Sequence, residues 1–430
     1  MNPFLTLLRR NHNYRNTWIG QVVSEVGDHF NNIAVFSLAL KLTGSGMVVT
    51  LVMLSRAIPA ILAGPLAGVV LDRMDRKRVM IASDLIRAVV ALGFILAWKY
   101  ENPALLYVFS ALLMLASPFF TSGRAAILPS IATREELHTA NALTQTTQWT
   151  TLSIGAFLGG ASSEVGFEWA FAFNSLSFLI SALCISRLHL PGAGFRPPRA
   201  AVTEAEVVRP WHEYMEGLLY MRSRPLIFGI GMIALGWATG GGAAQILFSL
   251  FGEKVFQKGS WGIGQIWGCA GVGLIAGGTL AYQLGKRLSF VNYKRAIVIC
   301  YVVHGGSYII FSQMRSYAGA LVFIALSRMA VGVSSTLNQG QLLRHVANEY
   351  RGRVFSTIES MQWSVMMVSM TLAGIASQTY DTRTIGTVAG ALSSTTAIFW
   401  GWAHVTGRLP EPAREGVEPQ EVEVHGEPTV

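Results

Sequence analysis

Two acids and two of the amides in the apolar stretch between residues 16 and 41 share a regular spacing. They recur at steps of four, three and four residues: Gln21, Glu25, Asp28 and Asn32. This spacing places all four side chains on one face of a helix. A carboxyl group that is kept from bulk water holds its proton more tightly, so it can bind and release protons near neutral pH. We therefore predict that Asp28 couples proton movement to function, with Glu25 as the second candidate.

A second interpretation of Asp28 is structural. Arg56 lies in the next apolar stretch at a comparable depth, and the two side chains would then form a permanent ion pair. The sequence leaves both roles open. Asp84 and Arg87 are three residues apart, a spacing that suits an ion pair on one helix, and we predict that they bind each other.

The composition places these acids in a membrane. Hydrophobic residues make up 51% of the chain and charged residues 13%, against about 25% charged residues in soluble domains. A membrane span needs ~20 mostly apolar residues. Twelve stretches qualify: residues 16–41, 47–71, 79–99, 103–128, 143–165, 168–190, 225–252, 261–284, 295–313, 316–342, 353–378 and 384–406. We predict an all-α integral membrane protein with twelve transmembrane helices in two six-helix bundles.

The basic residues predict the topology. Most of the 33 Lys and Arg residues lie in the loops on one side of these stretches, and that side faces the cytoplasm. Both termini are then cytoplasmic in a multi-pass protein of the cell (inner) membrane. The formal charge of +9 follows from this topology, so we expect no nucleic-acid partner.

The predicted domains follow the same pattern. They are an N-terminal six-helix bundle (1–190), a cytoplasmic linker (191–224), a C-terminal six-helix bundle (225–406) and a disordered cytoplasmic tail (407–430). The linker is rich in Pro, Ala and charged residues. Its last part has apolar residues at helical spacing, which predicts an amphipathic helix that either lies on the membrane surface or docks on the protein.

The two halves resemble each other at an offset of 214 residues. Gln148 and Trp149 then align with Gln362 and Trp363, and Gly160 aligns with Gly374. Parallel repeats of this kind are typical of secondary transporters. We predict a substrate cavity between the halves, lined by polar and amphipathic side chains: Gln21, Asn32, Arg56, Gln145, Gln148, Gln362 and Trp363.

The loop after the second stretch carries the motif Gly68-x-x-x-Asp72-Arg73-x-Asp75-Arg76-Lys77-Arg78. This motif resembles the loop 2–3 signature of the major facilitator superfamily, except that Asp75 replaces a glycine. The resemblance implies a latch between the two halves that holds one access state, formed by Gly68, Asp72, Arg73, Arg76 and Lys77. We expect two gate residues beside it: Arg124, bonding to Asp72, and Glu359, facing the latch. Contact with substrate is the second role for both.

Two further segments narrow the resemblance to one branch of that family. The segment FFTSGRAAILPSIATREELHTANAL, residues 119–143, is similar to the helix 4–5 region of the enterobactin-exporter and macrolide-efflux branch, and so is GQVVSEVGD, residues 20–28. Ser122 stands where that branch has a proline, and Ala156 where antiporters of the family have one. The resemblance implies proton-driven export of an amphipathic small molecule, such as a drug, macrolide or siderophore, by alternating access.

Other functions remain as alternatives. Uptake, or movement of a lipid such as a lysophospholipid, would use the same fold. The chain has no HExxH, GxSxG, paired-His or P-loop motif, which argues against a membrane enzyme or an ATP-driven pump. The repeat and the latch motif argue against a channel. We therefore predict no enzymatic activity, no cofactor and no metal, and a monomer whose partners are a small-molecule substrate, protons and the lipid bilayer.

Overall fold

The computed structural model describes residues 3–189, 195, 210–285 and 287–412, and within these it is helical. Twelve helices have 20 residues or more: α2 (His12–Thr43), α3 (Gly46–Arg73), α4 (Arg76–Lys99), α5 (Pro103–Ile131), α6 (Arg134–Gly160), α8 (Phe167–Ser186), α10 (Pro225–Leu250), α11 (Gly259–Gly285), α12 (Phe290–Gln313), α13 (Tyr317–His345), α14 (Asn348–Ala376) and α15 (Thr382–Val405). Four short helices accompany them: α1 (Pro3–Arg10), α7 (Ser162–Val165), α9 (Pro210–Arg222) and the π-helix η2 (Phe251–Val255). Each long helix overlaps one predicted span, so the twelve-helix prediction is confirmed.

Eight of the long helices are apolar enough to cross a membrane by composition, in the described parts of the chain. The other four are α2, α6, α14 and α15. Three of them, α2, α6 and α14, contribute residues to the central cavity described below. Their lower hydropathy has a physical reason, because a helix that faces a wet cavity does not need an apolar surface on every side.

The largest error in the predicted boundaries concerns α6. This helix begins at Arg134, nine residues before the predicted start at 143, and ends at Gly160. Thr133 and Glu136 form a capping box at its start, in which each side chain accepts a hydrogen bond from the other residue's backbone N–H. The first two turns are polar, so a hydropathy criterion cannot detect them although they are helical.

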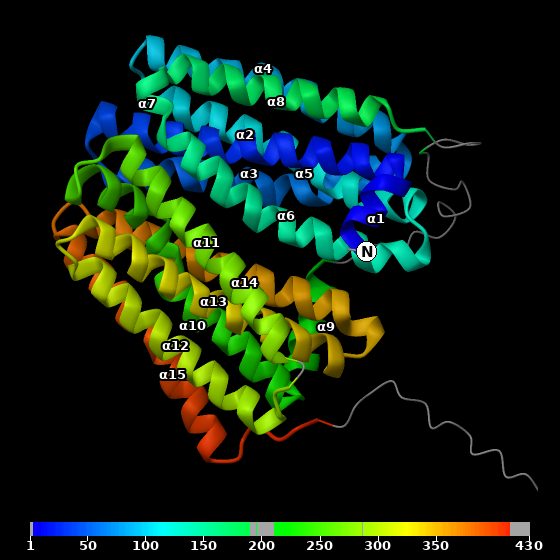
Figure 1. Cartoon of the computed structure of the whole chain (residues 1–430), viewed down its shortest axis with the longest axis vertical. Coiled ribbons are helices and arrows are strands. Elements are labelled where there is room, and N and C mark those ends of the chain that lie inside the picture. The colour runs from blue at the N-terminus through cyan, green and yellow to red at the C-terminus, as the bar shows by residue number, and fades with distance from the viewer. Residues whose placement is uncertain (1–2, 190–194, 196–209, 286, 413–430) are drawn as a thin grey trace, which may run out of the picture.

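The helices form two bundles, α2–α8 and α10–α15, which lie above and below one another in Figure 1 with α6 and α11 between them. The amphipathic helix α9 docks on α14. The rings of Tyr220 and Tyr350 stack with centroids 4.4 Å apart, and Arg353 forms a 3.0 Å ion pair with Glu216. Of the two interpretations of this segment, docking on the protein is the one observed. Residues 191–194 and 196–209 of the predicted linker and 413–430 of the predicted tail lie outside the described residues.

The contact between the bundles follows the internal repeat. A side-chain carbon on Gly160 of α6 would meet Trp261 of α11, and the backbone of Gly160 itself packs against Gly264. A side-chain carbon on Gly374 of α14 would collide with Thr50 of α3. Gly160 and Gly374, like Thr50 and Gly264, are 214 residues apart. The two bundles therefore meet at two equivalent helix pairs, as expected for repeats related by an axis along the membrane normal.

The two ends of the molecule are packed differently. We call the end with α1, α9 and the α3–α4 turn the linker end and the end with α7 the far end (Figure 1). Toward the far end, residues 33–40 of α2 and 243–250 of α10 are mostly buried. Toward the linker end, a side chain on Gly68 of α3 or Gly352 of α14 would meet nothing within 4 Å. The gap between α3 and α14 is thus sealed at the far end and open at the linker end.

Candidate functional site

A cavity of about 750 Å³ lies between the two bundles. Its lining residues come from both halves, on α2, α3, α5, α6, α10, α11 and α14. Pockets that hold drug-sized ligands span about 300–1,000 Å³, so the cavity has room for one such molecule.

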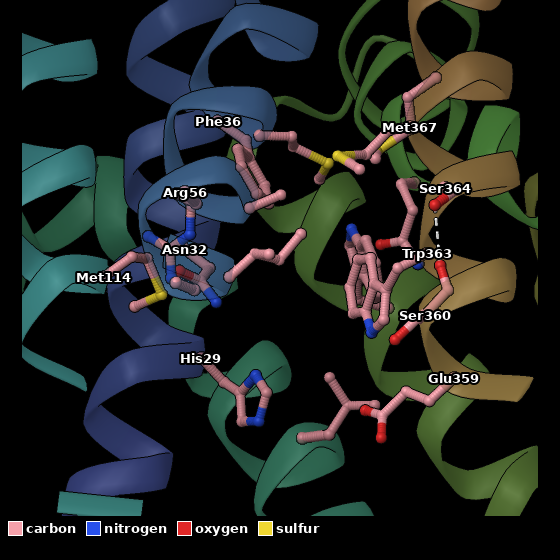
Figure 2. Close-up of a pocket in the computed structure, with 18 of the residues that line it drawn as sticks. His29, Asn32, Phe36, Arg56, Met114, Glu359, Ser360, Trp363, Ser364 and Met367 are labelled. Atoms are coloured by element: carbon pink, nitrogen blue, oxygen red, sulfur yellow. Dashed lines mark hydrogen bonds between the residues drawn. The ribbon is translucent and has the colours of Figure 1, made fainter. Parts of the chain in front are cut away.

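The two walls of the cavity carry different groups (Figure 2). Asn32 and Arg56 line the wall formed by α2 and α3, and Glu359, Ser360 and Trp363 line the α14 wall. Much of the remaining lining is aromatic or sulfur-containing: Phe36, Met53, Met114, Trp267, Met367 and Met370. Methionine side chains adapt their shape to different partners. The cavity therefore combines an adaptable apolar surface with a few fixed polar groups.

Three titratable side chains line the cavity: His29, Arg56 and Glu359. Nη1 of Arg56 and Oδ1 of Asn32 are buried and have no hydrogen-bond partner among the described residues. Neither Arg56 nor Glu359 takes part in an ion pair within the described ranges. The cavity thus presents one cation and one anion, on opposite walls, that no protein group neutralises by direct contact.

The structure places some of the predicted cavity residues in the lining and others elsewhere. Asn32, Arg56 and Trp363 line the cavity, as expected. Gln21 is buried and donates a 2.8 Å hydrogen bond to Glu25 Oε1 instead. Three further residues are not part of the lining: Gln145, Gln148 and Gln362. Gln145 and Gln148 lie outside the lining because α6 packs along α11, where Trp149 fills the space beside Gly278. Trp363, the equivalent of Trp149 on α14, lines the cavity.

The sequence reasoning missed other lining residues. His29 follows Asp28 directly and lies four residues after Glu25, so its position beside the polar stripe could have indicated it. Gln245 of α10 lies in a run of apolar and small residues that gave no signal. Glu359 was not missed: it was expected to face the latch first and to contact substrate second, and it lines the cavity.

Asp28 belongs to a buried charge cluster in the N-terminal half. Oδ2 of Asp28 lies 3.8 Å from Nη1 of Arg87, and Nη2 of the same guanidinium contacts Asp84. Arg87 also lies over the rings of Phe120 and Phe178, at 4.7 and 4.3 Å from their centroids. The predicted Asp84–Arg87 pair is therefore present. The predicted Asp28–Arg56 pair makes no contact within 4 Å, although Arg56 faces Asp28 at longer range. The guanidinium that Asp28 contacts comes from the third long helix rather than the second.

Glu25 forms a second cluster one turn away. Its Oε1 lies 3.6 Å from Nη1 of Arg124, and its Oε2 accepts a 2.8 Å hydrogen bond from Thr151. Arg124 was expected to bond to Asp72. It lies instead beside Glu25 because α2 passes close to α5, which the sequence order of the helices does not reveal.

The latch residues hold the N-terminal bundle together in this state. Arg76 donates a 2.9 Å hydrogen bond to the carbonyl of Ala126, and Lys77 donates one of 2.8 Å to that of Leu188. Asp72 and Arg73 are exposed. Gly68, which was expected to allow a close helix approach, faces open space. Asp75 caps the start of α4 by accepting from the backbone N–H of Arg78, which gives this departure from the family signature a structural role.

Comparison with known proteins identifies the family. The model of the Major Facilitator Superfamily matches residues 17–370. BacE of Bacillus subtilis (strain 168), which is named for bacilysin export, is 26% identical over 79% of this chain and 82% of its own. Macrolide efflux protein A of Streptococcus pyogenes is 23% identical over 83% and 87%, and the multidrug efflux pump Tap of Mycolicibacterium fortuitum is 23% identical over 81% and 85%.

Solved structures share the fold. A bacterial homologue of the iron transporter ferroportin, in an inward-facing state, superposes with a TM-score of 0.68 at 16% identity and covers 90% of this chain and 98% of its own. The nucleoside transporter NupG superposes with a TM-score of 0.66 at 14% identity over 91% and 99%. The cavity between two repeat-related bundles and the family match agree: this chain is a transporter of the major facilitator superfamily.

Proposed function

We propose that this protein is a secondary exporter that moves an amphipathic small molecule by alternating access. The observation that carries the proposal is the cavity itself, which lies between two repeat-related bundles, is sealed at the far end and opens at the linker end. Relatives that align over most of the chain are named for bacilysin export, macrolide efflux and multidrug efflux. An adaptable lining rich in Met and Trp suits substrates of this kind.

The linker end is the cytoplasmic end in this proposal. The basic residues that the positive-inside rule assigns to the cytoplasm lie in the loops of that end. The protein would then lie in the inner membrane as a monomer with both termini in the cytoplasm. In the state described here, the cavity faces the cytoplasm, which is the side from which an exporter loads its substrate.

Asp28 is our first candidate for the proton-coupling group and Glu25 the second. Several side chains face Asp28: Arg87 on α4, Arg56 on α3 and Asn174 on α8, with Glu25 on its own helix. Asp28 lies beside the cavity and not in its lining. A proton on Asp28 would therefore act through helix packing, because it removes the charge that attracts Arg87 to α2 and leaves this guanidinium to Asp84.

The latch completes the cycle in this proposal. When the bundles rock, the linker-end part of α3 with Gly68 approaches α14, and the exposed Asp72 and Arg73 come within reach of the C-terminal half. The contacts at the far end then open. The substrate and the proton can shift the equilibrium between the two states if they change the free-energy difference between them.

A transport screen tests the proposed function. Candidate drugs, macrolides and siderophores are presented to a host that lacks its own exporters and expresses the wild type or Asp28→Asn. We expect the wild type to export at least one compound against its gradient and Asp28→Asn to insert normally but lose uphill export. Asp381→Asn is the matched control, since Asn caps a helix as well as Asp does. Uphill export by Asp28→Asn at the wild-type rate would exclude Asp28 as the coupling group, and lipid movement or uptake without export would favour the alternatives.

A further inference from the structure

The central cavity holds two opposite charges that the protein leaves without a direct partner. Arg56 lies on the α3 wall and Glu359 on the α14 wall. Arg56 is partly buried, and an ion in a membrane-embedded site is costly unless an opposite charge or water compensates for it. Glu359 is exposed to the open cavity. Nearby in the N-terminal half, Glu25 pairs with Arg124, and Arg87 contacts both Asp28 and Asp84. Asp28 also faces Arg56 at longer range but does not contact it within 4 Å.

The neighbours of each charge suit a different end of one molecule. Nη1 of Arg56 is a buried donor that has no hydrogen-bond partner in the described parts, and the amide nitrogen of Asn32 beside it is a second donor. A guanidinium next to an amide is a site for a carboxylate. Beside Glu359, Ser360 and Trp363 lie along the same side of α14 (Figure 2). A carboxylate next to an indole ring is a site for an ammonium group, which the ring attracts through its π-electrons.

We propose that the substrate is a compact zwitterion with an apolar body. Its carboxylate binds Arg56 and Asn32, its ammonium group binds Glu359, and its apolar part lies against the Met and Trp residues between them. This inference rests on the proposed export function, whose substrate class it narrows. A ligand held by both walls also links the two bundles, so its binding favours states in which the walls approach each other.

The proposal predicts which half of the ligand each residue recognises. The probes are alanyl-phenylalanine, its methyl ester, which keeps only the cation, and its N-acetyl derivative, which keeps only the anion. Their affinities are measured by isothermal titration with the full-length protein in detergent. We expect the wild type to bind the dipeptide about ten- to a hundredfold more tightly than either derivative, since each lacks one charge-assisted contact.

Variants then assign the contacts. Arg56→Gln should weaken dipeptide binding by about the same factor without weakening the methyl ester, and Glu359→Gln should weaken the dipeptide without weakening the N-acetyl derivative. Arg56→Lys should restore part of the affinity, which separates loss of charge from misfolding. The matched controls are Arg315→Gln, in an exposed turn, and Glu349→Gln, at the exposed start of the same helix α14.

Three results would overturn the proposal: equal affinity of the wild type for the dipeptide and its methyl ester, unchanged dipeptide affinity in Arg56→Gln and Glu359→Gln, or no binding of any of the three probes. These titrations are made at equilibrium and without a proton gradient. They therefore test the ligand's charges independently of the transport screen. The transport of Asp28→Asn, or an absence of export, tests only the assignment as an exporter.

Discussion

Arg87 holds two carboxylates in the N-terminal bundle, and its replacement gives a sharp test of the charge cluster. Arg87 is 2% exposed, and the Asp84 that it contacts is 0% exposed. Arg87→Gln removes the shared cation and leaves two acids in a buried site. Breaking a buried ion pair by removing one partner costs about 3–5 kcal/mol, and the two ring contacts add up to about 2 kcal/mol. We expect a loss of about 4 kcal/mol in the free energy of unfolding.

The compensating variant separates the cluster from a general packing defect. Arg87→Gln with Asp84→Asn removes the more deeply buried acid together with the cation. Asp28, the more exposed of the two acids, is then the one that remains, and Arg56 faces it. We therefore expect the double variant to recover about 2 kcal/mol relative to Arg87→Gln alone. The free energies are measured by reversible unfolding in mixed detergent micelles, with Arg315→Gln as the control, which should stay within about 0.5 kcal/mol of the wild type. Strictly additive effects of the two substitutions, or an Arg87→Gln variant as stable as the wild type, would refute the proposed charge balance.

Three further predictions concern the latch and the helix contacts. Gly68→Leu should leave the melting temperature unchanged, because a side chain there meets open space. It should lower transport about tenfold if the state closed at the linker end loses about 1.4 kcal/mol of stability. Transport equal to that of the wild type would show that α3 and α14 do not meet at Gly68. Gly374→Leu should collide with Thr50 and lower stability by about 1–3 kcal/mol, as measured by thermal unfolding in detergent. Asp75→Ala should lose about 1 kcal/mol through the α4 cap, whereas Asp75→Asn should lose almost nothing; equal losses in both would mean that the cap is not the cause.

Hydropathy and repeat spacing were sufficient to predict the twelve helices, because a span must be apolar over about 20 residues whatever it packs against. The start of α6 was missed because its first turns are polar and held by the capping box at Thr133. The contacts of the charged residues were harder. Spacing on one helix correctly paired Asp84 with Arg87, but the partners of Asp28 and Arg124 depend on which helices are neighbours in space.

The prediction of the cavity lining was limited in the same way, because it also depends on which helices are neighbours in space. Asn32 was predicted from its position on the polar stripe of α2, and Trp363 from its amphipathic character at a repeat-equivalent position on α14. Gln148 was predicted by equivalence to Gln362, yet neither lines the cavity. Equivalent positions in the two halves have different neighbours because α6 and α11 are in contact along their length, whereas α3 and α14 are in contact only at the far end. Which pair is open in a given state is a property of the conformation and cannot be predicted from residue spacing.

Access to the cavity from both sides of the membrane tests the account most directly. A single cysteine at Ser364, which lines the α14 wall, is introduced into a variant with Cys184, Cys269 and Cys300 replaced by serine. A membrane-impermeant maleimide is then applied from either side, with Arg315→Cys as a marker of the far side. We predict labelling from the linker side in the resting protein and labelling from the far side once a transported compound and a proton gradient are supplied. Labelling from one side only under every condition, or no labelling at all with Arg315→Cys reactive, would contradict alternating access through this cavity.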